Sequence, residues 1–217
     1  MNSLPILYSF RRCPFAIRTR MSLVEAGINV ELREVLLKDK PVEMLNVSPK
    51  GTVPVLINSS ENDEVLDESL DIMVWALKRG RTDWLAGPVG LERQLEMIRD
   101  FESRFKPLLD SYKYHDASKE FTVEYYRNQG MKEIEGLETA LSTSAYLLGD
   151  RPRLFDVAVM PFIRQFAHVE LDWFNDQDVP SLHRWLRDWL QSEEFKLVMK
   201  KYQAWKPGHE LTVFGLA

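Results

Sequence analysis

The sequence predicts two domains of different classes, an α/β layer followed by a bundle that is entirely helical. Strand-like and helix-like segments alternate up to about residue 80. The next stretch contains Gly87-Pro88 and Gly90, which is typical of a linker. Beyond it the strand patterns stop, and apolar residues follow helical spacing. We therefore expect an N-terminal domain over 1–80, a linker over 81–90 and an all-helical domain over 91–217.

The first domain is expected to have the order βαβαββα. Its expected strands cover 5–9, 30–36, 51–57 and 64–66, its helices cover 17–26 and 69–78, and a short helical piece ends near Asn46. Gly27 is expected to stop the first helix as a C-terminal cap. A polar turn over 58–63 is expected to join the last two strands.

The second domain is expected to contain helices over 91–112, 119–141, 154–169, 181–190 and 193–202. Pro107 is expected to kink or end the first of these helices, because proline lacks the N–H that the interior of a helix requires. Gly130 and Gly136 are weak points in the second helix. A stripe in the fourth helix is interpreted as core rather than as a ligand site; it contains Leu182, Trp185, Leu186 and Trp189.

The composition limits which partners and which compartment the protein can be expected to have. The chain has 217 residues, of which 45% are hydrophobic, so it can bury a substantial core. A net charge of −5 without a basic cluster argues against nucleic acid as a partner. One cysteine rules out an internal disulfide framework and fits a reducing compartment. With neither a signal-peptide pattern nor a membrane-length apolar run, we expect a soluble, cytoplasmic protein with no membrane contact.

Cys13 stands where the first strand turns into the first helix, with Pro14 at the first helical position. A helix N-terminus carries free N–H groups and a partial positive charge, both of which favour a thiolate over a thiol. The adjacent Arg12 acts in the same direction. The alternative is that Cys13 is a small buried hydrophobic residue, which is the common role of a lone cysteine. Its position favours a reactive thiol.

Two other stretches are candidates for chemistry. Val53-Pro54 opens a strand and is either a cis peptide bond, which would leave the Val53 backbone free to bind a peptide, or a trans proline at an edge strand. Glu68-Ser69 precedes a helix, where Ser69 is either only an N-cap or part of a carboxylate site. Glu68 could hold an ammonium group. A thiolate, a free backbone and a carboxylate site together suit a small peptide with a γ-glutamyl end and a thiol.

These stretches resemble the glutathione transferase superfamily, and most of all its cysteine-type, omega-like members. The similar segments are Tyr8-Ser9-Phe10-Arg11-Arg12-Cys13-Pro14-Phe15-Ala16, Arg18-Thr19-Arg20, Lys38-Asp39-Lys40-Pro41, Val53-Pro54-Val55-Leu56 and Glu68-Ser69. The resemblance covers essentially the whole chain. It implies a thioredoxin-like N-terminal domain, an all-α C-terminal domain, glutathione as co-substrate, no metal, and a homodimer.

The resemblance also implies roles for individual residues. Cys13 matches the catalytic cysteine, and Lys40 matches a lysine near the glycyl carboxylate of glutathione. Val53 matches the residue before the cis-proline, and Glu68 and Ser69 match the pair that holds the γ-glutamyl end. The expected activity is thiol transfer or reduction through a mixed disulfide between Cys13 and glutathione. The alternatives are S-conjugation to an electrophile and a non-enzymatic binding protein like stringent starvation protein A.

Two features depart from the family pattern. Arg153 stands where the family usually has a Ser or Thr cap three residues before an Asp, here Asp156, and this difference bears on folding rather than catalysis. The tail from Tyr202 to Ala217 does not match clearly enough to assign a second-substrate pocket. Candidate pocket aromatics, each better explained as core or surface, are Tyr112, Tyr114, Phe166, Trp173 and Phe174.

Overall fold

The computed structural model describes residues 4–58, 64–80 and 82–216 and divides the chain into two compact units. One unit contains the residues up to Thr82 together with those from Ser192 onward, and the other contains Asp83–Gln191. The C-terminal segment was expected to belong to the helical domain, and the structure instead groups it with the α/β unit. Most of the polar turn expected over 58–63 lies outside the described residues.

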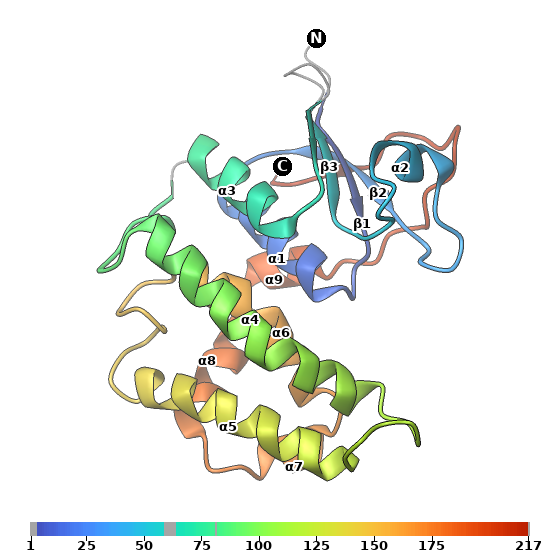
Figure 1. Ribbon diagram of the computed structural model, residues 1–217. Coiled ribbons are helices and arrows are strands. Elements are labelled where there is room, and N and C mark those ends of the chain that lie inside the picture. The colour runs from blue at the N-terminus through green and yellow to red at the C-terminus, as the bar shows by residue number, and fades with distance from the viewer. Residues whose placement is uncertain (1–3, 59–63, 81, 217) are drawn as a thin grey trace. The chain divides into compact units, whose positions relative to one another are not determined.

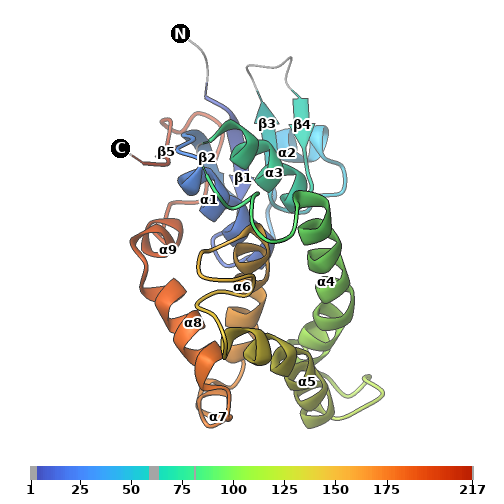
Figure 2. The same ribbon diagram turned by 90° about the vertical axis from the view of Figure 1, so that its left-hand side faces the viewer.

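The first unit is built on a five-stranded sheet of order β4-β3-β1-β2-β5 (Figure 2). β1 pairs with β2 in parallel, whereas the pairs β1–β3, β3–β4 and β2–β5 are antiparallel. Its elements are β1 (Ile6–Ser9), α1 (Pro14–Glu25), β2 (Val30–Glu34), α2 (Val42–Val47), β3 (Val55–Asn58), β4 (Glu64–Leu66), α3 (Ser69–Arg79), α9 (Glu193–Val198) and β5 (Val213–Phe214). This is the predicted βαβαββα order, extended by α9 and β5. The unit has a thioredoxin-like fold.

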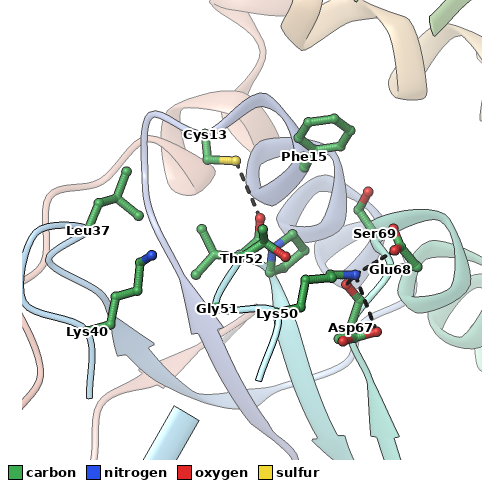
Figure 3. A pocket seen from close by; sticks show the side chains of 12 residues that line it. Cys13, Phe15, Leu37, Lys40, Lys50, Gly51, Thr52, Asp67, Glu68 and Ser69 are labelled. Atoms are coloured by element: carbon green, nitrogen blue, oxygen red, sulfur yellow. Dashed lines mark hydrogen bonds and ion pairs between the residues drawn. The ribbon is translucent and has the colours of Figure 1, made fainter. Parts of the chain in front are cut away.

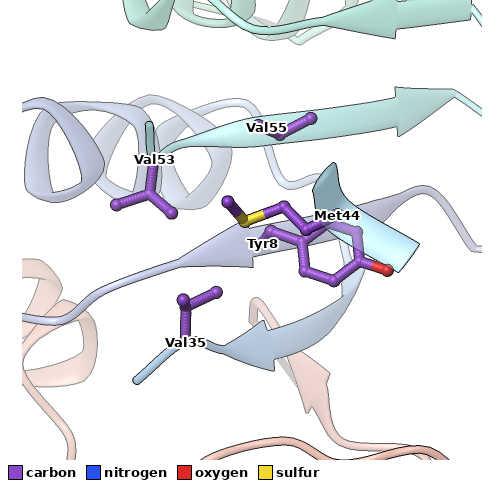
Figure 4. Close-up of a cluster of buried hydrophobic side chains, with 5 residues drawn as sticks. All are labelled: Tyr8, Val35, Met44, Val53 and Val55. Atoms are coloured by element: carbon purple, nitrogen blue, oxygen red, sulfur yellow. The ribbon is translucent and has the colours of Figure 1, made fainter. Parts of the chain in front are cut away.

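Helices cover both faces of the sheet, α1 and α3 on one and α2 on the other (Figure 1). β1 and β3 are therefore largely buried on both sides, as their apolar runs without alternation predict. On the α2 face, Met44 packs against side chains of β1 and β3 and of the loops that follow β2 and precede β3 (Figure 4). This cluster consists of Tyr8, Val35, Met44, Val53 and Val55, with Cys13 and Trp205 among the partly buried residues packed against it.

The C-terminal tail completes the first unit. α9 ends at Val198 rather than at Tyr202, and the chain then continues without regular secondary structure, with a turn at residues 207–208, to the edge of β2. The Trp205 N–H donates to the Glu34 carbonyl at 2.8 Å, and the Leu32 N–H donates to the Thr212 carbonyl at 2.8 Å. Beyond these contacts β5 pairs with the outer side of β2. The tail thus supplies hydrogen-bond partners that the edge of β2 would otherwise lack.

α1 ends as the sequence predicts. Gly27 has φ +67°, its N–H donates to the Val24 carbonyl at 3.0 Å, and the Ile28 N–H donates to the Leu23 carbonyl at 2.9 Å. This is the Schellman arrangement, which places glycine in the left-handed region just after a helix. Other boundaries differ: β2 ends at Glu34, and β3 begins at Val55 because residues 51–54 form a loop.

The second unit is helical throughout its regular structure. It contains α4 (Leu91–Lys113), α5 (Val123–Leu141), α6 (Leu154–Ala167), α7 (Leu171–Asn175) and α8 (Pro180–Gln191). α4 packs against α5 and α6, and α8 packs against α5 and α6. The stripe Leu182, Trp185, Leu186 and Trp189 is buried, which confirms that it is core. α7 is not predicted from the sequence, and α5 begins four residues later than predicted, because the Thr122 hydroxyl caps the helix by accepting a hydrogen bond from the Tyr125 N–H.

Of the two expected effects of Pro107, a kink or an end of the helix, the structure excludes the second. The helix continues to Lys113 because its apolar face is held on both sides of the proline. The Phe105 and Tyr112 rings pack on the Phe166 ring of α6 at centroid distances of 5.5 and 5.1 Å. This burial offsets the hydrogen bond that the proline removes. Of the aromatics considered for a pocket, Tyr112, Phe166 and Phe174 are buried, and Tyr114 is exposed.

The described residues were expected to contain neither a membrane-spanning helix nor a metal site. Within the described residues, no helix combines the length and hydropathy needed to cross a bilayer. The same residues contain no group of three or more His, Cys, Asp or Glu side chains arranged to hold a metal ion.

Gly130 allows α5 to approach α6 closely. A Cβ added there would lie 2.6 Å from Cε2 of Phe166, whose ring is confined by neighbouring rings. We expect Gly130→Ala to lower the free energy of unfolding by about 1–2 kcal/mol, because overpacking outweighs the gain in helix propensity. Gly136→Ala, in the same helix with nothing within 4 Å, should instead stabilise by up to about 1 kcal/mol. Urea unfolding of both variants checks this, and equal effects would contradict it.

Asp156 joins three segments of the second unit. Its Oδ1 accepts from the Leu147 N–H at 2.8 Å and from Trp185 Nε1 at 3.0 Å, and its Oδ2 accepts from the Arg153 N–H at 3.0 Å. An arginine at the cap position therefore leaves intact the half of the capping box that Asp156 provides. Burial raises the pKa of Asp156 to about 6, although these hydrogen bonds act in the opposite direction.

This shift predicts a dependence of stability on pH. The folded state holds the Asp156 proton more tightly than the unfolded chain, in which an aspartate pKa is about 3.9. The resulting stabilisation is complete below that value and is lost as pH rises through about 6. Compared with Asp156→Asn, which does not titrate, the wild type should lose roughly 2 kcal/mol of unfolding free energy between pH 4 and 7. Denaturant unfolding across this range tests it, and a constant difference would contradict it.

Candidate functional site

A pocket of about 470 Å³ in the first unit collects all five residues that the sequence singled out. They are Cys13, Lys40, Val53, Glu68 and Ser69, and the rest of the wall consists of Phe15, Leu37, Lys50, Gly51, Thr52, Pro54 and Asp67. Figure 3 shows the Cys13 sulfur above the 52–54 loop, Lys40 to one side, and the Glu68–Ser69 corner on the other. Residues from four separate segments of the chain therefore meet in one cavity.

Cys13 is the N-terminal cap residue of α1, and Pro14 begins the helix, as predicted. The Cys13 thiol donates to the Val53 carbonyl, with Sγ and O 3.6 Å apart (Figure 3). The Cys13 side chain is partly buried against the cluster on the α2 face of the sheet. The guanidinium of the adjacent Arg12 lies over the Phe10 ring, 5.5 Å from its centroid.

A buried ion pair holds the loop that carries Cys13. Arg20 of α1 is fully buried and pairs with Glu34 at the end of β2. The second Glu34 oxygen accepts the Arg11 N–H at 2.8 Å, two residues before Cys13. Arg20 Nε also donates to Ser9 Oγ at 2.8 Å, and its Nη1 donates to the Val198 carbonyl at 3.2 Å. Burial lowers the pKa of Arg20, and Glu34 counters this effect.

The Val53-Pro54 bond is cis, which settles the alternative that the sequence left open. Val53 lies in the loop before β3, outside the paired strand residues. Gly51 in the same loop has φ +65°, and a Cβ added there would lie 3.7 Å from Lys40 Nζ. The Lys40 ammonium therefore lies beside this loop.

Ser69 is not the cap of α3, which corrects one reading of the sequence. Glu68 is the N-cap residue, and Ser69 begins the helix. The Ser69 hydroxyl oxygen accepts two hydrogen bonds from the buried Arg18, from Nε at 3.1 Å and from Nη2 at 2.8 Å. A hydroxyl has two lone pairs and one proton. With both lone pairs occupied, the proton is available to an acceptor in the pocket, close to the free N–H groups of the α3 N-terminus.

Three pocket features were missed at the sequence level. Arg18 lies behind Ser69, and Lys50 and Asp67 lie beside Glu68. Partial burial would lower the pKa of Lys50, but the hydrogen bond to Glu68 and the charges of Glu68 and Asp67 outweigh it, so that the pKa is raised. Nothing local in the sequence marks these residues, because their partners are 17 to 51 positions away.

Comparison with known proteins identifies the family. A family model described as Glutathione S-transferase, N-terminal domain, matches residues 7–81. Glutathione S-transferase omega-1 of Mus musculus is 32% identical over 172 residues, covering 76% of this chain and 68% of the relative. Glutathione S-transferase U19 of Arabidopsis thaliana is 28% identical over 193 residues, covering 87% and 86%.

Solved structures share the fold. A glutathione transferase family member from Pseudomonas fluorescens, with two glutathione bound, superposes with a TM-score of 0.78 at 18% identity, covering 92% of this chain and 93% of that one. Glutathione transferase URE2P6 from Phanerochaete chrysosporium, in complex with oxidized glutathione, gives a TM-score of 0.76 at 21% identity, covering 90% and 94%. From the sequence relatives and this shared fold together, we conclude that the chain belongs to the glutathione S-transferase superfamily.

Proposed function

We propose that the protein is a glutathione-dependent thiol transferase that uses Cys13 as its nucleophile. The observation that carries the proposal is the single pocket in which Cys13 meets Lys40, Val53, Glu68 and Ser69. A helix N-terminus favours the thiolate form of Cys13, and the thiolate is the reactive species. The relatives named omega-1 support the same assignment.

In the proposed reaction the Cys13 thiolate attacks the glutathione sulfur of a mixed disulfide. A Cys13–glutathione disulfide forms, and the other thiol leaves as a thiolate that takes a proton from water. The thiolate of a second glutathione then attacks the glutathione sulfur held on Cys13, which releases glutathione disulfide and regenerates the Cys13 thiolate. Because Cys13 is the only cysteine of the chain, no second cysteine can resolve the intermediate.

The pocket suggests how glutathione is oriented. The γ-glutamyl carboxylate is assigned to the Ser69 hydroxyl and the α3 N-terminus, and the γ-glutamyl ammonium to Glu68. The glycyl carboxylate is assigned to Lys40. The Val53 backbone, in the loop beside the sulfur, is assigned to the cysteinyl unit of glutathione. This order places the glutathione thiol next to Cys13.

S-conjugation is a second candidate, supported by similarity to the relative named Glutathione S-transferase U19. The two reactions require different things of residue 13. Thiol transfer needs a sulfur that forms a disulfide, whereas conjugation needs only a hydrogen bond to the glutathione thiolate. Variants at Cys13 therefore distinguish the reactions.

Cys13→Ser should abolish transfer from a glutathione mixed disulfide, because a hydroxyl cannot form the disulfide intermediate. Its affinity for glutathione should change little, since binding is assigned to other residues. Coupled reduction of a hydroxyethyl–glutathione disulfide measures transfer, and calorimetry measures binding. Cys13→Ala is the matched control, and conjugation gained by the serine variant but not by the alanine variant would be compatible with the proposal. Full transfer activity in either variant would make the nucleophile assignment wrong.

The same calorimetry tests the non-enzymatic alternative. If the wild type does not bind glutathione, the protein is better described as a non-enzymatic protein that binds other macromolecules.

Ser69→Ala should have two separable effects. The loss of one hydrogen bond to a charged group should weaken glutathione binding roughly tenfold. The loss of the acceptor for Arg18 should lower the free energy of unfolding by about 1–3 kcal/mol. Calorimetric titration reports the first effect, and thermal melting without ligand reports the second. Ser69→Thr keeps the hydroxyl and serves as the control. A lower melting point with unchanged affinity would mean that Ser69 only holds Arg18, and the proposed orientation of glutathione would be wrong.

A further inference from the structure

Lys50 lies between the carboxylates of Asp67 and Glu68 at one corner of the pocket. Lys50 Nζ donates to Glu68 Oε1 at 2.5 Å and to the Asp67 carbonyl at 3.0 Å, and it lies 3.5 Å from Asp67 Oδ1 (Figure 3). The other Asp67 oxygen, Oδ2, accepts from the buried Ser48 hydroxyl at 2.8 Å. Asp67 is therefore fixed from one side by Ser48, and Lys50 links it to Glu68.

The charges at this corner do not cancel. Asp67 and Glu68 carry two negative charges and Lys50 carries one positive charge, so that one negative charge remains. The side chains of Lys50 and Glu68 are 38% and 67% exposed, so a ligand can reach both. Ser69, with Arg18 behind its hydroxyl, comes next in the chain and faces the same pocket. The group of Asp67, Lys50 and Glu68 thus carries one unbalanced negative charge, and Ser69, with the positive charge of Arg18 behind it, forms a neighbouring site suited to an anion.

We propose that Lys50 is a specificity-determining residue that makes this corner select a zwitterionic end group, one ammonium together with one carboxylate. The inference rests on the proposed function, which assigns the γ-glutamyl end of glutathione to Glu68 and Ser69. Lys50 neutralises one of the two acids, so that a single ligand ammonium balances the other. It also reduces the repulsion that two acids would exert on the ligand carboxylate at Ser69.

Removing the Lys50 charge should shift the selectivity of this corner toward an ammonium and away from a carboxylate. The corner would then carry two unbalanced negative charges, which attract an ammonium more strongly and repel a carboxylate more strongly. An exposed charge interaction of this kind corresponds to about a threefold change in affinity. A ligand whose end group has only the ammonium (amine-only) should therefore bind more tightly, and a ligand whose end group has only the carboxylate (acid-only) should bind more weakly. General damage to the pocket would instead weaken the binding of both ligands.

The test uses three S-methylated peptides, which cannot exchange disulfides with Cys13. They are S-methylglutathione, its analogue with γ-aminobutyrate in place of the glutamyl residue, which lacks the α-carboxylate, and its glutaryl analogue, which lacks the α-amino group. Calorimetry gives the dissociation constant of each peptide for wild type and Lys50→Met. We expect the variant to bind the amine-only peptide about threefold more tightly and the acid-only peptide about threefold more weakly, so that their ratio shifts about tenfold. S-methylglutathione should change less than either analogue.

Two variants control for charge and for fold. Lys50→Arg keeps the positive charge and should leave the ratio unchanged. Lys78→Met removes an exposed positive charge from the last turn of α3, outside the pocket, and should also leave it unchanged. A ratio that does not move in Lys50→Met, or affinities that all fall together, would overturn the inference, while binding of S-methylglutathione by the wild type would still support the proposed glutathione site. Failure of the wild type to bind any of the three peptides would overturn both.

Discussion

The buried pair of Arg20 and Glu34 is the interaction on which the first unit depends. The Glu34 carboxylate accepts a hydrogen bond from the Arg11 N–H in the loop before Cys13. The Glu34 backbone carbonyl accepts one from the Trp205 N–H in the C-terminal tail. Arg20 joins α1 to the end of α9 through the Val198 carbonyl. Breaking a buried pair by removing one partner leaves a charge without compensation, which costs several kcal/mol. One ion pair therefore connects the sheet, the cysteine loop, the first helix and the last residues of the chain.

The pocket is built from the ends of elements rather than from their middles. Cys13 and Ser69 lie at the starts of α1 and α3, and Val53 lies in the loop before β3. At such positions the backbone hydrogen-bonding groups are not used up within the element, and they remain available to a ligand. Arg18 extends this arrangement, because it occupies the lone pairs of Ser69 and leaves the proton for the pocket. The proposed glutathione site thus combines backbone polarity with a few charged side chains.

The parts of the structure that the sequence predicted correctly depend on short local patterns. The strand–Cys13–Pro14–helix junction, Gly27 as a helix stop and the α/β order of the first unit can each be recognised within a few residues. The parts that it missed depend on distant partners. The sequence allows Ser69 to be a helix cap or part of a carboxylate site, but no local pattern indicates its partner Arg18, which is 51 positions away. β5 is two residues long, too short for any periodicity, and only pairing with β2 defines it. Pro107 does not end α4, because packing against α6 outweighs the local preference of proline.

The position of β5 has a consequence for folding during synthesis. The ribosome releases the first four strands of the α/β unit before the helical unit, but the strand that covers the edge of β2 follows the helical unit in the sequence. The helical unit is continuous in sequence, so all of its residues emerge before that strand does. The nascent α/β unit must therefore wait with an open sheet edge, which is a site at which unfinished chains can aggregate. The α/β unit, whose first strands precede the helical unit, is thus completed after it.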